Sequence, residues 1–141
     1  MITAERFEYR AAAAGLTEPM VRKVIDSFYE KVRRDDVLGP VFNDALGDHW
    51  DAHIQRIVLF WLTATRLGAG YQARNFMPAH LHNRAIRAGL LPRWLELFRE
   101  TAAAECTPEA AAVLVDIAER MAESLTITLK RRDRGDAPGR S

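Results

Sequence analysis

The amino-acid sequence predicts an all-α protein in which four long helices are joined by short connecting pieces. Apolar residues recur at three- and four-residue intervals through several long stretches, as they do on the buried face of a helix. No stretch shows the alternation of apolar and polar residues that is typical of a half-buried strand. Proline, glycine and hydroxyl residues separate the periodic stretches, where they are expected to begin and end helices.

The first part of the chain is predicted to hold a short helix, a long helix and a corner. Residues 4–14 form the short helix, which Gly15 ends. The long helix begins at Thr17-Glu18-Pro19, which supplies a capping hydroxyl, an acidic first turn and a proline that needs no N–H partner. It ends at Asp35-Asp36, whose carboxylates are expected to be solvated. Residues 37–42 predict a tight corner with one turn of helix, because a Gly-Pro pair interrupts them.

Three more long helices are predicted in the second part of the chain. One runs from a cap at or beside Asp48 to about Leu67, just before a pair of glycines. Pro92 opens the next, which ends near Cys106. The last begins at Thr107-Pro108 and carries an apolar face as far as Leu129. We therefore expect one domain over residues 1–131 and a flexible C-terminal tail over residues 132–141.

Composition narrows the range of partners and locations. The chain has 141 residues, a net charge of +1 and a single cysteine. This charge gives no bulk field that would favour nucleic acid or an anionic membrane, so neither is an expected partner. No window reaches the ~18 to 20 uncharged apolar residues of a membrane span. One cysteine excludes an intrachain disulfide and fits a reducing cytoplasm, which is the predicted location.

Histidines and aromatic residues carry the chemistry that the sequence suggests. No nucleophile triad and no glycine-rich phosphate loop is present, and His49 and His53 lack the further ligands of a zinc site. Nine residues are expected to face inward: Phe28, Tyr29, Phe42, His53, Ile57, Trp61, His80, Trp94 and Phe98. Such a set suits a flat apolar cofactor with one axial imidazole bond to iron and polar side chains near a gas ligand.

Two of these residues have a plainer interpretation as well. His80 follows Pro78, which is expected to open a brief helix after an irregular loop over residues 71–77. The imidazole could bind a metal, or it could be a polar cap on a connecting helix. Tyr29 could point its hydroxyl into a ligand pocket, or it could be a core residue with one buried hydrogen bond.

Four sequence blocks, in order and correctly spaced over about residues 17–130, resemble the truncated hemoglobins, most closely their third group. The blocks are Phe28-Tyr29-Glu30-Lys31-Val32 followed by Asp35, Leu38 and Pro40-Val41-Phe42; Trp50-Asp51-Ala52-His53 with Phe60-Trp61; Met77-Pro78-Ala79-His80; and Arg93-Trp94-Leu95-Glu96-Leu97-Phe98. Two features depart from the family pattern. The loop from Tyr71 to Met77 lacks a usual glycine and proline, and Leu90-Leu91-Pro92 replaces a common His-Phe pair.

The resemblance implies a 2-on-2 globin fold, in which two helices pack on two others around heme b (iron protoporphyrin IX). It implies that His80 is the proximal iron ligand, because the rival His82 lies two residues too close to Trp94 in sequence. It assigns Tyr29, His53 and Trp94 to the distal side. The remaining heme-pocket residues are then Phe28, Phe42, Arg56, Ile57, Phe60, Trp61, Tyr71, Met77 and Phe98. Arg56 could pair with a heme propionate or be a solvated arginine.

Three functions follow from this interpretation. The first is a heme protein that reversibly binds O2, CO, NO or another small ligand, for oxygen transport or sensing. The second is a heme redox enzyme that turns over peroxide or nitric oxide with the help of a reductase. The third is a heme-free helical interaction module in which the histidines and Tyr29 fill the core. A monomer or a weak homodimer is expected in each case.

Overall fold

The computed structural model describes residues 11, 13–65 and 86–134. In this part of the chain every regular element is helical, and no strand is present. The elements are α2 (Glu18–Arg34), α3 (Leu38–Leu46), the 3₁₀ helix η1 (Gly47–His49), α4 (Trp50–Ala64), the 3₁₀ helix η2 (Ala88–Leu90), α6 (Leu91–Glu105) and α7 (Pro108–Asp133). The predicted all-α class and its four long helices, α2, α4, α6 and α7, are confirmed.

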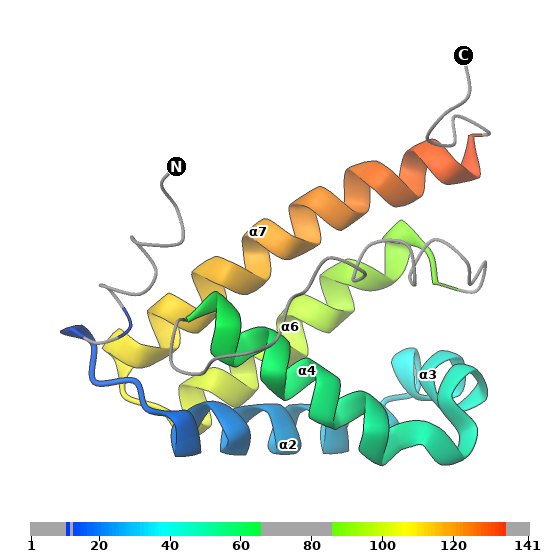
Figure 1. The fold of residues 1–141 in the computed structure, drawn as a ribbon. Helices are drawn as coiled ribbons and strands as arrows, with labels where there is room; N and C mark the ends of the chain where they lie inside the picture. Colours follow the sequence, from blue (N-terminus) through cyan, green and yellow to red (C-terminus); the bar gives the residue numbers. More distant parts are fainter. Residues whose placement is uncertain (1–10, 12, 66–85, 135–141) are drawn as a thin grey trace.

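The four long helices pack as two pairs. The helix α2 contacts α4, and α6 contacts α7. Contacts between α2 and α6 then join one pair to the other, and Figure 1 shows α2 and α4 lying across the α6–α7 pair. The short helix α3 packs on the end of α2. None of the helices in the described ranges is long and apolar enough to cross a lipid bilayer.

The predicted starts of α2 and α7 are confirmed in detail. The Thr17 hydroxyl accepts a hydrogen bond from the Met20 N–H at 3.4 Å, and the Thr107 hydroxyl accepts one from the Ala110 N–H at 3.2 Å. Each helix has a proline in its first turn, where the missing N–H leaves no intrahelical bond unmade. The apolar face predicted for α2 is also buried, and it consists of Val21, Val24, Ile25, Phe28, Tyr29 and Val32.

The predicted cap at or beside Asp48 is confirmed, because α4 begins at Trp50 and its N-cap is His49. Two predicted boundaries were wrong. The corner after α2 contains a nine-residue helix, α3, rather than one turn. The helix α7 continues to Asp133, into the stretch predicted as a tail. The Arg132 side chain is only 5% exposed, and its guanidinium donates to the Ile86 carbonyl at 2.7 Å.

Other expected features fall partly or wholly outside the described residues. Gly15 has a φ of +80°, as expected for a glycine that ends a helix, although most of the helix predicted before it lies outside the described residues. The α4 helix ends at Ala64, and residues 66–85 are not described. The predicted loop and the brief helix with His80 lie in that range. The division into a domain and a tail stays a prediction.

Candidate functional site

A pocket opens between the two helix pairs. It spans about 690 Å³ of space, a volume that includes solvent at its open mouth. Its walls are largely apolar and come from α2, α3, α4, the segment before α6, α6 itself and α7. The described lining residues are Tyr29, Leu38, Phe42, His53, Ile57, Phe60, Trp61, Ile86, Arg87, Leu90, Leu91, Trp94, Met121, Ala122 and Leu125.

Seven of the residues predicted for the site line this pocket. They are Tyr29, Phe42, His53, Ile57, Phe60, Trp61 and Trp94. Tyr29 comes from α2 and Trp94 from α6, so the structure brings together residues far apart in sequence. Helical spacing accounts for most of the set from α4, because His53, Ile57 and Trp61 lie four residues apart on one face and Phe60 lies three residues after Ile57.

The other predicted site residues have different positions. Phe28 and Phe98 are fully buried and do not line the pocket, because they lie behind the residues that do. Arg56 is exposed on α4 and does not line the pocket either. His80, Tyr71 and Met77 lie outside the described residues.

Phe28 and Phe98 support the lining residues through ring contacts. The Phe28 ring meets those of Tyr29 and Trp94 edge to face, with centroids 4.7 and 5.4 Å apart. The Phe98 ring stacks on those of Trp61 and Trp94, with centroids 5.1 and 5.8 Å apart. We call Phe28, Tyr29, Trp61, Trp94 and Phe98 the aromatic wall. Pairs with these spacings each stabilise by about 0.5 to 1.5 kcal/mol beyond the area they bury.

The Tyr29 hydroxyl is the main polar group of the pocket wall. The residue is only 4% exposed, and burial raises the pKa of its hydroxyl to about 12, although a hydrogen bond with Trp94 opposes this rise. The indole can only donate, so Trp94 lowers the pKa of Tyr29 as a donor toward its oxygen. The Tyr29 O–H therefore stays protonated at neutral pH, and it can donate a hydrogen bond to another acceptor.

His53 lies next to this pair. Its ring meets the Tyr29 ring edge to face, with centroids 5.9 Å apart, and it meets the Trp50 ring in the same way at 6.3 Å. The imidazole is half-buried and lines the pocket from α4. Two polar side chains from two different helices thus reach the same part of the pocket.

Several lining residues were missed by sequence reasoning. They are Leu38, Ile86, Arg87, Leu90, Leu91, Met121, Ala122 and Leu125. The apolar face of α7 already predicted that Met121 and Leu125 face inward, but sequence spacing does not tell which turn of a long helix meets a cavity. Arg87 does not belong to any periodic apolar pattern in the sequence. It is exposed and is the only lysine or arginine among the described lining residues.

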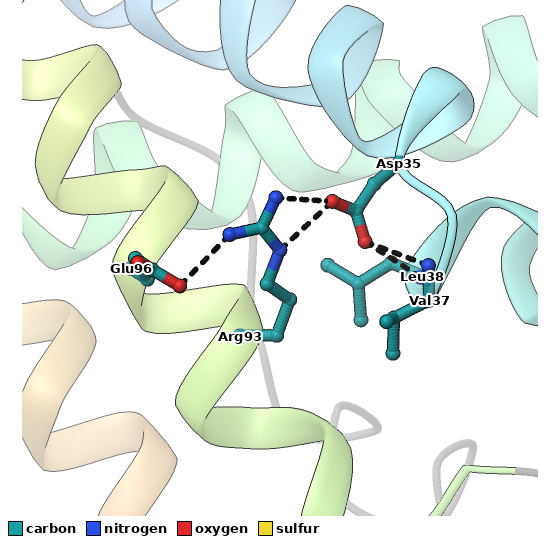
Figure 2. A network of polar contacts seen from close by, with 5 residues as sticks. All are labelled: Asp35, Val37, Leu38, Arg93 and Glu96. Atoms are coloured by element: carbon teal, nitrogen blue, oxygen red, sulfur yellow. Dashed lines mark hydrogen bonds and ion pairs between the residues drawn. The ribbon is translucent and has the colours of Figure 1, made fainter.

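A set of polar contacts lies near this pocket, and we call it the polar corner (Figure 2). Arg93 donates to Asp35 Oδ1 from Nη2 at 2.6 Å and from Nε at 2.8 Å, and to Glu96 Oε1 from Nη1 at 2.8 Å. The other Asp35 oxygen accepts from the Val37 and Leu38 N–H groups at 3.0 and 2.9 Å. The prediction that Asp35 is solvated was wrong, because its side chain is only 5% exposed.

The chemistry of the pocket fits a heme group. A porphyrin needs flat apolar walls, which the aromatic rings and aliphatic residues provide, and it carries two carboxylates that need cations or water. Arg87 is available for one of these carboxylates at the pocket wall. In the described ranges, no group of three or more His, Cys, Asp or Glu side chains is placed to hold a bare metal ion.

Comparison with known proteins agrees with this geometry, although no family model matches the chain. The chain is 34% identical over 89 residues to the group 3 truncated hemoglobin ctb of Campylobacter jejuni, covering 61% of this chain and 69% of that protein. The crystal structure of a group III truncated hemoglobin from Campylobacter jejuni superimposes with a TM-score of 0.74 and 28% identity, over 81% of this chain and 91% of the other. The chain therefore belongs to the group III truncated hemoglobins and has their 2-on-2 globin fold.

Proposed function

We propose that this protein holds heme b in the pocket with His80 as the proximal iron ligand, and that it reversibly binds O2 or another diatomic ligand beside Tyr29. Membership in a globin family implies a heme cofactor and a small gas ligand. The observation that carries the proposal is the buried, neutral Tyr29 hydroxyl on the wall of an apolar pocket.

The residues that would hold the cofactor divide by role. Phe42, Ile57 and Phe60 offer apolar surface to a flat ring. His80 is proposed as the axial ligand because its spacing from Trp94 in the sequence matches the family, whereas that of His82 does not. Arg87 lies on the pocket wall and is therefore better placed than Arg56 to pair with a carboxylate of the cofactor. Tyr71 and Met77 stay predictions.

Bound heme supplies the iron that binds a diatomic ligand, and the chain supplies hydrogen-bond donors. A ligand that carries partial negative charge can accept a hydrogen bond from the Tyr29 O–H, which would stabilise it by about 1 to 2 kcal/mol. Trp94 can act on Tyr29 only as a donor, so it leaves the Tyr29 O–H free to donate to the ligand. We expect such a bond to slow ligand escape, which suits retention or sensing better than simple delivery of O2.

Tyr29→Phe tests this role directly. Losing the hydroxyl should speed O2 dissociation at least several-fold, because the ring stays in place while the donor is lost. Stopped-flow measurement of the dissociation rate checks it. Ser27→Ala is a matched control, since it removes a hydroxyl of α2 that donates to Glu105 at 3.2 Å, outside the pocket. An unchanged rate in Tyr29→Phe would exclude Tyr29 as the donor.

A heme redox enzyme is the second candidate. Tyr29, His53 and Trp94 together form a polar group that could polarise an O–O bond. Steady-state turnover of hydrogen peroxide with ascorbate, or of nitric oxide with a reductase, separates this function from reversible binding. A reductase partner, a monomeric or weakly dimeric state and a cytoplasmic location stay predictions, as does the third possibility of a heme-free helical module.

A further inference from the structure

The polar corner joins three parts of the chain that also line the pocket. Asp35 follows α2, the helix that carries Tyr29. Its Oδ2 accepts the N–H groups that begin α3, whose Leu38 lines the pocket and is fully buried. Arg93 stands in the first turn of α6, directly before Trp94. Figure 2 shows Arg93 reaching from α6 to Asp35 across the gap between these elements.

The pair between Asp35 and Arg93 differs from the surface ion pairs of this protein. The Asp35 side chain is 5% exposed, and four N–H groups point at its two oxygens. By contrast, Arg99 pairs with Glu119 at 2.8 Å while both side chains are about half exposed. Exposed pairs restrain their helices little, because water and salt compete for them. A buried carboxylate held by a guanidinium and by backbone N–H groups is far more directional.

We propose that Asp35 and Arg93 form a positioning pair that holds the first turn of α6 against the end of α2, so that the Trp94 indole keeps its place beside Tyr29 on the pocket wall. Through that placement the pair sets the rate at which a gas ligand leaves the pocket. This part of the inference rests on the proposed function. The placement of the Trp94 indole can be observed without it.

The chemistry of the two groups supports this role. Arg93 is the main reason that the pKa of Asp35 lies below its ordinary value, so the carboxylate stays charged throughout the neutral range. The guanidinium donates from two nitrogens to one carboxylate oxygen and from a third to Glu96. A lysine would keep the charge but would lose this fork, so it should restore the contact only in part. Because Trp94 is the next residue, a shift of this turn moves its indole N–H.

The placement of Trp94 can be tested by hydrogen exchange of the indole N–H protons, measured by NMR. The full chain is used in its reduced, CO-saturated form, or as purified if it holds no heme. Arg93→Gln should speed exchange of the Trp94 indole proton at least several-fold. It should leave the Trp50 indole proton unchanged, because that N–H donates to Asn43 at 3.0 Å. Arg93→Lys should give an intermediate rate, and it keeps the test available if the glutamine variant folds poorly.

Arg99→Gln is the matched control, since it breaks an exposed pair on the same helix. It should change neither indole rate. Equal acceleration of Trp50 and Trp94 exchange in Arg93→Gln would indicate general loosening, and unchanged Trp94 exchange would show that the pair does not position the indole. Either result would overturn the proposal.

Ligand escape supplies the second test. Arg93→Gln should speed O2 dissociation several-fold in the natural sequence and should add nothing when Trp94 is already phenylalanine, because the pair acts through that indole. If the increases in O2 dissociation rate caused by Arg93→Gln and by Trp94→Phe multiply in the double variant, the pair does not act through the indole, and the proposal is overturned. If the chain takes up no heme, the proposed function fails, while indole exchange still decides whether Asp35 and Arg93 position Trp94.

Discussion

The aromatic wall and the polar corner stabilise the same pocket in different ways. The wall consists of five rings from three helices, and contacts with centroids 4.7 to 5.8 Å apart link them, most of them through Phe28 and Phe98. The corner depends on one buried carboxylate and the four N–H groups around it. Many non-directional contacts keep a shape when one is weakened, whereas a few directional bonds fix a position and lose it when one partner is changed. The aromatic wall should therefore contribute more to the free energy of unfolding, and the polar corner should fix the position of the first turn of α6.

The largest expected effect is on the wall. Phe98→Ala should lower the free energy of unfolding by about 3 to 5 kcal/mol, because a fully buried ring is lost and leaves a cavity. Urea denaturation measures it. Leu59→Ala is the control on α4, where the side chain is 37% exposed, and it should cost less than about 1 kcal/mol. Similar losses in both variants would show that the wall is not the main source of stability.

A smaller effect is expected where α3 crosses the end of α2. A Cβ atom on Gly39 would lie 2.7 Å from the Arg33 carbonyl oxygen, so the backbone would have to shift. Gly39→Ala should therefore cost about 1 to 3 kcal/mol of unfolding free energy. Gly89→Ala is the matched control, because no other atom lies within 4 Å of its added Cβ and its stability should change by no more than about 0.5 kcal/mol. Equal effects would contradict the close approach.

The polar corner also predicts a dependence on pH. The hydrogen bond that Arg93 donates to Asp35 lowers the pKa of this carboxyl below its ordinary value, although burial opposes the change. The Leu38 and Val37 N–H groups lower it further. A lowered folded-state pKa adds stability that is fully present above the unfolded-state value and is lost as the pH falls through the folded-state value. The stability gap between the natural protein and Arg93→Gln should be constant near neutral pH and narrow below about pH 4. Urea titrations at stepwise lower pH measure the gap, and one that stays constant would contradict this account.

The smallest effect is expected for the exposed pair of α6 and α7. Arg99→Gln should cost less than about 1 kcal/mol, because both of its partners are about half exposed and the pair gains little in water. Urea denaturation at low and high salt checks this, and salt should remove most of the difference. A loss as large as that of Gly39→Ala would mean that surface pairs matter here as much as the buried corner.

Sequence patterns predicted the wall better than the corner for a physical reason. Apolar spacing reports which side of a helix is buried, so Tyr29 on α2 and Phe98 on α6 were assigned inward correctly. The length of α3 was underestimated, since Gly39 and Pro40 suggested a break where they fit the first turn. The burial of Asp35 depends on Arg93, which comes from a distant helix, and no local pattern reports such a partner.

The most direct test of the central claim is the UV–visible spectrum of the purified protein, oxidised and then reduced with dithionite, compared with His80→Ala and His82→Ala. Heme ligation by His80 predicts a Soret band in the natural protein that His80→Ala disrupts and His82→Ala leaves in place. Disruption by His82→Ala instead would contradict the assignment of the axial ligand. No Soret band even after addition of hemin would contradict heme binding itself.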